Sequence, residues 1–318
     1  MNNDLLNFAY QVQHANYQAC IAPEGFGTCN KDVIKAHSIQ NKQILEEIQD
    51  CGHVVMLLAS ISGFKSVDIE FKRIGRNRAT IFTGLCHHHD NLFFAPIERD
   101  SIDIINPEHL FLLAYRAIIK QTHSLMNAAH QARLLFDKKT DLGLIIKKDA
   151  LSEEEEYLLT RTFMAFKLHI YKQAYDSIYI NQRYEDLCHE IIKINQEIPT
   201  IAVNAFFSFQ RERMAAKYSG GVALNIFPKG DETIVIFSYL CSEESLVSPH
   251  INDILSSSGE QQECLLSKLI LQNCENFAIN PKHFETFSKL KIERIKEYFT
   301  KTLFYDDVDV NCEEISLF

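Results

Sequence analysis

Four cysteine and histidine residues near the beginning of the sequence have the types and spacing of a metal site. Cys20 and Cys29 enclose the glycine-containing segment CIAPEGFGTC, and Cys86 and His89 belong to the segment LCHHHD. Structural zinc is held by a tetrahedron of nitrogen and sulfur ligands, and a gap of about two residues between paired ligands is standard. The sequence therefore predicts one structural zinc ion, bound by two ligands from each of two turns.

The ligand set has alternatives at two positions. His37 could take the place of Cys20, and either His87 or His88 could take the place of His89, because the three histidines are consecutive. We favour His89 because its spacing from the preceding cysteine is the common turn geometry. The competing interpretation is a set of reduced cysteines buried in a core, where this residue type is frequent.

The order of these segments resembles the treble-clef module of HNH, or His-Me finger, endonucleases over residues 20–98. A cysteine pair comes first, a histidine follows in the short β-like run IKAHSIQ, and a C-x-x-H-D turn then opens a helix-like segment. The chain is also similar to bacterial proteins that share the AHSIQ and FTG-C-x-x-H-D segments. The resemblance implies two zinc knuckles, formed by Cys20 with Cys29 and by Cys86 with His89.

The same resemblance implies the residues of a catalytic site. It makes His37 the general base and places Asp90 where the family has a histidine that binds the catalytic metal. A carboxylate suits hard cations such as magnesium or manganese. The family's usual acidic residue before the catalytic histidine is Ala36 in this chain, and Asn77 and Asn91 are the candidates for its middle asparagine.

Both proposed catalytic residues have a second interpretation. His37 could instead be a zinc ligand or a core histidine with satisfied hydrogen bonds. Asp90 could be the N-cap of the helix that follows the second knuckle, because aspartate is favoured at that position.

The densest group of basic residues precedes the second knuckle. Lys72, Arg73, Arg76 and Arg78 occur within seven positions of one another and are expected to contact phosphates near the site. The alternative is an exposed hairpin tip with solvated charges. The formal net charge of −10 argues against non-specific coating of nucleic acid, but it leaves room for a local basic groove.

Taken together, these residues predict a metal-dependent HNH-like endonuclease that cleaves phosphodiester bonds in DNA or RNA. Such a nuclease would fit a role in bacterial defence. A protein activator would be a fitting partner. The alternative function is a non-catalytic, zinc-stabilised module that binds nucleic acid or protein. A zinc enzyme acting on another class of substrate is a third hypothesis.

Other common chemistries lack their sequence signatures. The chain contains no Walker motif, no dinucleotide glycine fingerprint and no G-x-S-x-G elbow. It also has no run of about twenty apolar residues and no secretory signal, so we expect a cytoplasmic protein without a membrane partner. In that compartment the nine cysteines should be reduced.

The pattern of apolar residues predicts an α+β protein with three regions: a zinc-bound treble-clef module (1–103), a helical middle region (104–198) and an α+β C-terminal domain (199–318). Asn106-Pro107 and the capping box of Ser152 with Glu155 mark the starts of two long helices. The other expected helices cover 39–49, 181–195, 259–275 and 281–303. The expected strands cover 54–60, 67–74 and 78–84 (as a hairpin around Gly75), 201–209, 221–227 and 232–240.

Overall fold

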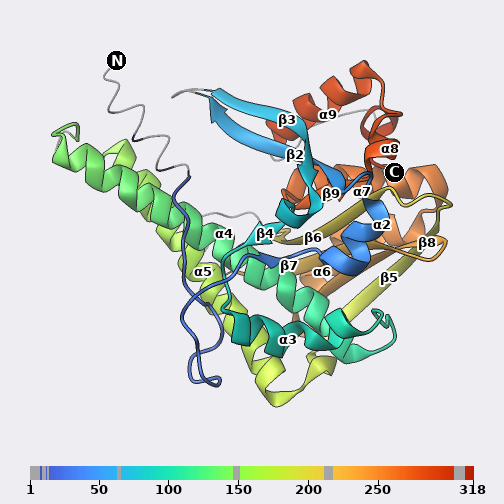
Figure 1. Ribbon diagram of the computed structural model, residues 1–318, viewed down its shortest axis with the longest axis horizontal. Helices are drawn as coiled ribbons and strands as arrows, with labels where there is room; N and C mark the ends of the chain where they lie inside the picture. The colour runs from blue at the N-terminus through green and yellow to red at the C-terminus, as the bar shows by residue number, and fades with distance from the viewer. Residues whose placement is uncertain are drawn as a thin grey trace.

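The computed structural model describes residues 8, 12, 14–62, 66–145, 151–210, 218–303 and 312–318. It is an α+β protein, as predicted (Figure 1). None of the described helices combines the length and the apolar composition that crossing a lipid bilayer requires. The strands are β1 (Ala36–His37), β2 (His53–Ser62), β3 (Ser66–Gly75), β4 (Ile81–Phe82), β5 (Leu187–Asn195), β6 (Ile201–Ser208), β7 (Gly221–Lys229), β8 (Glu232–Leu240) and β9 (Phe277–Ile279). The α-helices are α2 (Glu46–Ile48), α3 (His87–Arg99), α4 (Pro107–Asp141), α5 (Glu153–Asn181), α6 (Glu244–Ser256), α7 (Gly259–Asn273), α8 (Pro281–Phe284) and α9 (Lys289–Thr302), and the short turns are η1 (Asn41–Leu45), η2 (Arg76–Arg78), η3 (Tyr184–Asp186), η4 (Cys241–Glu243) and η5 (Cys312–Ile315).

One large sheet organises the described part of the chain. Its seven strands lie in the order β3-β2-β9-β6-β7-β8-β5, and every neighbouring pair is antiparallel. Strands β2 and β3 come from the predicted N-terminal region and β5 from the predicted middle region. The sheet thus takes strands from all three regions that the sequence analysis distinguished.

The sheet separates two hydrophobic cores. Along β6, Ala202 and Phe206 face the core shared with α3, α4 and α5, whereas Ile201 and Val203 face the core shared with α6, α7 and α9. This alternation is the period-two pattern of a strand that is buried on both faces. The result is a helix–sheet–helix arrangement, and the far end of the α4–α5 hairpin projects beyond the sheet (Figure 1).

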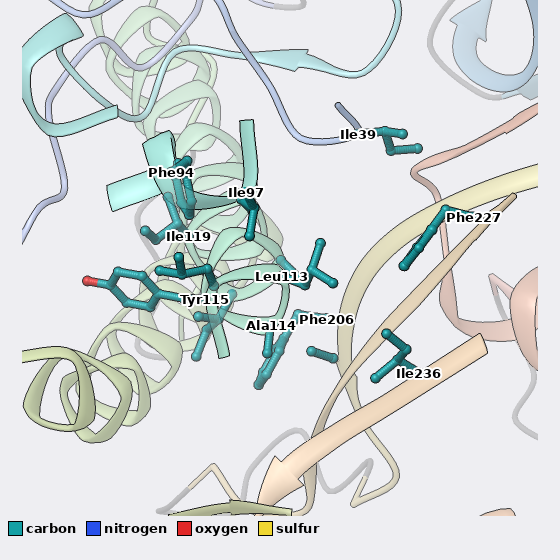
Figure 2. Close-up of a cluster of buried hydrophobic side chains, with 14 of the residues drawn as sticks. Ile39, Phe94, Ile97, Leu113, Ala114, Tyr115, Ile119, Phe206, Phe227 and Ile236 are labelled. Carbon is teal, nitrogen blue, oxygen red and sulfur yellow. The ribbon is translucent and has the colours of Figure 1, made fainter. Parts of the chain in front are cut away.

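Helix α3 belongs to the first of these cores. Figure 2 shows Phe94 and Ile97 of α3 beside Ile119 and Leu113 of α4, with Phe206 and Phe227 of the sheet beyond Leu113. Phe94 and Ile97 have no exposed surface. The segment that follows the second predicted knuckle is therefore joined to the sheet through α4.

The signals at the starts of the two long helices are confirmed. The Asn106 side chain accepts a hydrogen bond from the Glu108 N–H (2.9 Å) at the beginning of α4. At the beginning of α5, the Ser152 hydroxyl and the Glu155 side chain form the complete capping box. Both signals involve residues two or three positions apart, so the local sequence determines them.

The prediction of a helix over 181–195 was wrong. Helix α5 ends at Asn181, and Gln182 adopts a left-handed conformation with a φ of 54°. The segment then forms β5, which pairs with β8 along its whole length. Its isoleucine-rich run is well suited to a strand, and the available edge of β8 decides between the two structures. The expected helix over 281–303 is also interrupted and consists of α8 and α9.

The predicted hairpin around Gly75 was wrong in its pairing. The actual hairpin joins β2 to β3, with His53 opposite Gly75. The expected second arm turns away at η2, and Thr80 adopts a positive φ of 57°. Its short continuation β4 instead pairs with β1. This departure brings β1 beside the chain that leads into α3.

The prediction of reduced cysteines was wrong for three described residues, because Cys188, Cys241 and Cys264 are disulfide-bonded. Cys188 of β5 and Cys241 of η4 form a disulfide, with their Cα atoms 5.0 Å apart. The two residues are separated by 53 positions. Only the pairing of β5 with β8, which the sequence analysis did not anticipate, brings them together.

A buried ion pair within α5 is joined to α4 by a hydrogen bond. The Lys172 ammonium of α5 lies 2.6 and 2.8 Å from the two carboxylate oxygens of Asp176, and the Tyr115 hydroxyl of α4 donates to Asp176 at 2.8 Å. Burial lowers the pKa of Lys172, and the charge of Asp176 opposes that effect. The charge on Lys172 is therefore supported chiefly by one neighbouring carboxylate.

We predict that Asp176→Asn lowers the free energy of unfolding by about 3–5 kcal/mol, because it leaves a buried ammonium without its counter-charge. Chemical denaturation monitored by circular dichroism would measure the loss. Asp137→Asn is the matched control, since Asp137 pairs with Arg133 at the same i,i+4 spacing on an exposed helix surface. That control should leave the stability nearly unchanged. Equal effects of the two substitutions would contradict the prediction.

Candidate functional site

The four predicted metal ligands lie together. The ligand atoms of Cys20, Cys29, Cys86 and His89 are all within 4.8 Å of one another, which makes this group able to hold a metal ion. The Sγ atoms of Cys20 and Cys86 each lie 3.3 Å from His89 Nδ1. Within the described residues, His37 is not a member of this group. The ligand choice that the sequence favoured is thus the one that the fold gathers.

Backbone pairing explains how two distant turns meet. The Ile21 N–H donates to the Gly84 carbonyl at 2.9 Å, which aligns the chain after the first cysteine with the chain before the third. Gly25 and Gly27, which lie between the first two cysteines, have φ values of 75° and 73°. Glycine adopts this left-handed conformation without a steric penalty, so the loop can fold back toward α3.

The orientation of the His89 ring suits a metal ligand. Its Nε2–H donates to the Phe26 carbonyl at 2.7 Å, which leaves the Nδ1 lone pair directed toward the cysteine sulfurs. A hydrogen bond of this kind fixes the tautomer of metal-binding histidines. The His89 ring stacks on Phe93, and Phe26 packs edge-on against Tyr179 of α5. The loop between Cys20 and Cys29 therefore contacts the α4–α5 hairpin as well as α3.

The cysteine thiols of the site differ in acidity. Burial raises the pKa of Cys86, but hydrogen bonds from the His89 and Asn30 backbone and from the Cys20 and Cys29 thiols outweigh it and leave the pKa lowered. Burial raises the pKa of Cys20 to about 11. Cysteine binds metals as the thiolate, so binding at this site must release protons.

His37 lies outside this group, on the short strand β1. It pairs with Ile81 of β4, and its Nδ1–H donates to the Ala79 carbonyl at 3.0 Å. The neutral ring then keeps a lone pair on Nε2, which is the atom that can accept a proton. Burial lowers the pKa of His37, so the neutral form prevails at neutral pH.

Asp90 lies in the first turn of α3. The N-cap of this helix is Cys86, so the alternative role of Asp90 as the N-cap is wrong. Burial raises the pKa of the Asp90 carboxyl, and the nearby Arg116 opposes that shift. Its carboxylate makes no hydrogen bond or ion pair with any residue that the structure describes. It is therefore free to bind a cation.

Two charged residues that the sequence analysis did not single out complete this region. Asp90, Phe94 and Glu98 are four residues apart and share one face of α3. Arg116 of α4 lies against that face: its Nη2–H donates to Glu98 at 2.7 Å, and its guanidinium lies 4.1 Å from the centre of the Phe94 ring. The charges of Arg116 and Glu98 influence the pKa values of both His37 and Asp90.

The sequence does contain a feature that could have singled out Arg116 as a functional residue. It is a single charge within the apolar stretch LFLLAYRAII, where an arginine needs a specific partner. Because it belongs to α4, the candidate site crosses the expected boundary between residues 103 and 104.

The predicted basic cluster is largely engaged with acidic side chains. Three of its members form ion pairs: Lys72 with Glu70, Arg73 with Asp50 and Arg76 with Glu46. Arg78 is exposed and forms no ion pair with the described residues. Arg76 is the member of the cluster whose charge influences His37. Lys72, Arg73 and Arg76 would have to exchange or share their present partners to contact a phosphate, whereas Arg78 would not.

No protein family model, curated protein or solved structure matches this chain. The arrangement of the site itself is therefore the basis for an inference about function.

We predict that Cys86→Ser removes most of the bound metal and unfolds the N-terminal loops, because thiolate–metal bonds can contribute on the order of 10 kcal/mol to small metal modules. Elemental analysis by mass spectrometry and thermal melting would measure both effects. The control is Cys51→Ser, which changes an exposed free cysteine outside the group. Metal content and melting temperature equal to those of the parent in the Cys86 variant would refute the metal site.

Proposed function

We propose that this protein is a metal-dependent endonuclease of the HNH type, which hydrolyses phosphodiester bonds in DNA or RNA. The observation that carries the proposal is the hydrogen bond from His37 Nδ1–H to the Ala79 carbonyl. This hydrogen bond occupies Nδ1 and leaves the basic lone pair of His37 on Nε2. His37 is not among the four candidate metal ligands. The order of two short antiparallel strands (β1 and β4) followed by helix α3 also supports the treble-clef resemblance.

In this proposal the metal at the cysteine group is zinc and its role is structural. Three sulfur donors and one imidazole nitrogen are a donor set that zinc prefers. Four protein ligands complete a tetrahedral shell and leave no position for a substrate. The ion would join the loop after Cys20 to the first turn of α3, and it would thereby fix Asp90 relative to β1.

The chemistry then depends on His37 and Asp90. His37 Nε2 would accept a proton from a water molecule as the water oxygen attacks phosphorus, and the leaving oxygen would take a proton from solvent. The free carboxylate of Asp90 would hold a magnesium or manganese ion, which when bound supplies positive charge at the phosphate. Both side chains are half-buried, which strengthens electrostatic interactions at the site relative to open solvent.

We predict that His37→Ala lowers the rate of nucleic-acid cleavage by about 10²–10⁴-fold, because a positioned general base is lost. Asp90→Asn should also be inactive, while both variants keep the parent's metal content and melting temperature. Cleavage of single- and double-stranded DNA and RNA with magnesium or manganese would be measured. His53→Ala, which changes an exposed histidine of β2, is the control. Loss of the structural metal on removing His37, with no cleavage by the parent, would favour the non-catalytic binding module.

We also predict the position of the acid limb of the pH–rate profile. Burial holds the pKa of His37 below its ordinary value of 6.5, so the base stays neutral as the pH falls from 8 to about that value. The rate should therefore decrease only at lower pH, where His37 gains a proton. Measurements of kcat/KM against pH, with metal content determined at each pH, would test this. A limb centred above the ordinary histidine pKa would exclude His37 as the base.

A further inference from the structure

Arg116 is an unusually buried arginine with few partners. Its side chain is only 2% exposed, although it carries a permanent positive charge. A guanidinium has five N–H donors. Among the described residues, the only hydrogen bond of this group is the one from Nη2 to Glu98. Its Nε is fully buried and has no hydrogen-bond partner in the described part of the chain.

This arrangement is incomplete as a structural ion pair. A buried guanidinium is expected to satisfy its donors, commonly with both oxygens of a carboxylate. Here the contact with Glu98 uses one oxygen, and the other donors of the fork have no hydrogen bond to the residues that the structure describes. Arginine forks match the oxygens of phosphate in geometry and charge. Phe94, under the guanidinium plane, stabilises its orientation.

The two partners differ in their access to solvent. The Glu98 side chain is 43% exposed, whereas Arg116 is almost completely buried. Glu98 can therefore rotate into water at little cost in solvation, and its departure would leave Nη2 available beside the other unused donors. Both residues act electrostatically on His37 and Asp90, so the fork belongs to the same region as the proposed catalytic groups.

We propose that Arg116 is the phosphate-binding residue of the candidate active site, and that Glu98 occupies part of its fork until a phosphodiester replaces it. The inference rests on the proposed nuclease function and deepens it, because it assigns a substrate contact to α4, outside the zinc-bound segment. The opposing interpretation is that the Arg116–Glu98 pair only fastens α3 to α4.

Binding of inorganic phosphate to the metal-loaded full chain, measured by isothermal titration calorimetry, separates the two interpretations. Glu98→Gln removes the competing charge and should tighten binding about tenfold, whereas Arg116→Lys should weaken it about tenfold because a lysine lacks the fork. Arg99→Gln, which changes the neighbouring exposed arginine of α3, should leave the affinity unchanged. If Arg116→Lys does not fold, the Glu98→Gln result decides, and an affinity no tighter than the parent's overturns the inference.

Cleavage assays on the same proteins distinguish this inference from the proposed function. A nuclease whose KM and kcat are unaffected by Arg116→Lys would overturn the role of Arg116 and leave the endonuclease intact. Phosphate binding that depends on Arg116, in a parent that cleaves neither DNA nor RNA, would support the anion site and count against the nuclease. An increase in KM larger than the decrease in kcat is the expected result for a residue that holds the substrate.

Discussion

The burial of one face of α3 against α4 is the contact on which the candidate site depends. Phe93, Phe94 and Ile97 are completely buried, and side chains of this kind stabilise a fold by about 1.5–3 kcal/mol each. Helix α4 in turn packs across β6 and β7 of the large sheet. The helix that carries Asp90 and His89 is thus held by the main core of the protein. The segment 20–98, cut out of this chain, would lose the surface that orients α3.

The strand that carries His37 buries Ala36 in the same core and is held by polar contacts as well. Ser38, the next residue, donates its hydroxyl hydrogen to the Thr80 carbonyl at 2.8 Å. Asn276, just before β9, donates to the Ser38 hydroxyl at 2.9 Å and to the Asn204 carbonyl at 2.7 Å. Apolar packing fixes α3, and a chain of hydrogen bonds from the central sheet adds to the apolar burial of β1. The two halves of the proposed active site therefore depend on the C-terminal region for their relative position.

Features of the sequence that depend on near neighbours were predictable. The capping box of Ser152 and the N-cap Asn106 involve residues within one helical turn, and the spacing of Cys86 and His89 pointed to two side chains that the fold does bring together. The same holds for the strands β6, β7 and β8, whose apolar runs are bounded by turn residues. Local chemistry is sufficient in each of these cases.

Features that depend on partners distant in the sequence were not predictable. The segment 187–195 is isoleucine-rich and compatible with either a helix or a strand, and only the free edge of β8 makes it β5. The partner of β3 is β2 because the chain turns away after Gly75. Arg116 and Glu98 are 18 positions apart and meet only when α3 crosses α4. Recognising that pair required the packing of two helices, which no spacing in the sequence encodes.

The edge strand β3 also bears on how the protein behaves at high concentration. A terminal strand offers unpaired N–H and C=O groups to any other extended chain, and many β-proteins protect such edges with charged side chains, lysine above all. Asp68, Glu70 and Lys72 occupy alternate, exposed positions along β3, and the last two form an ion pair. Another sheet could add to this edge only by crowding their charges and removing them from water. Lys72, first considered for its attraction to phosphate, thus contributes to keeping separate copies of the molecule from joining sheet to sheet.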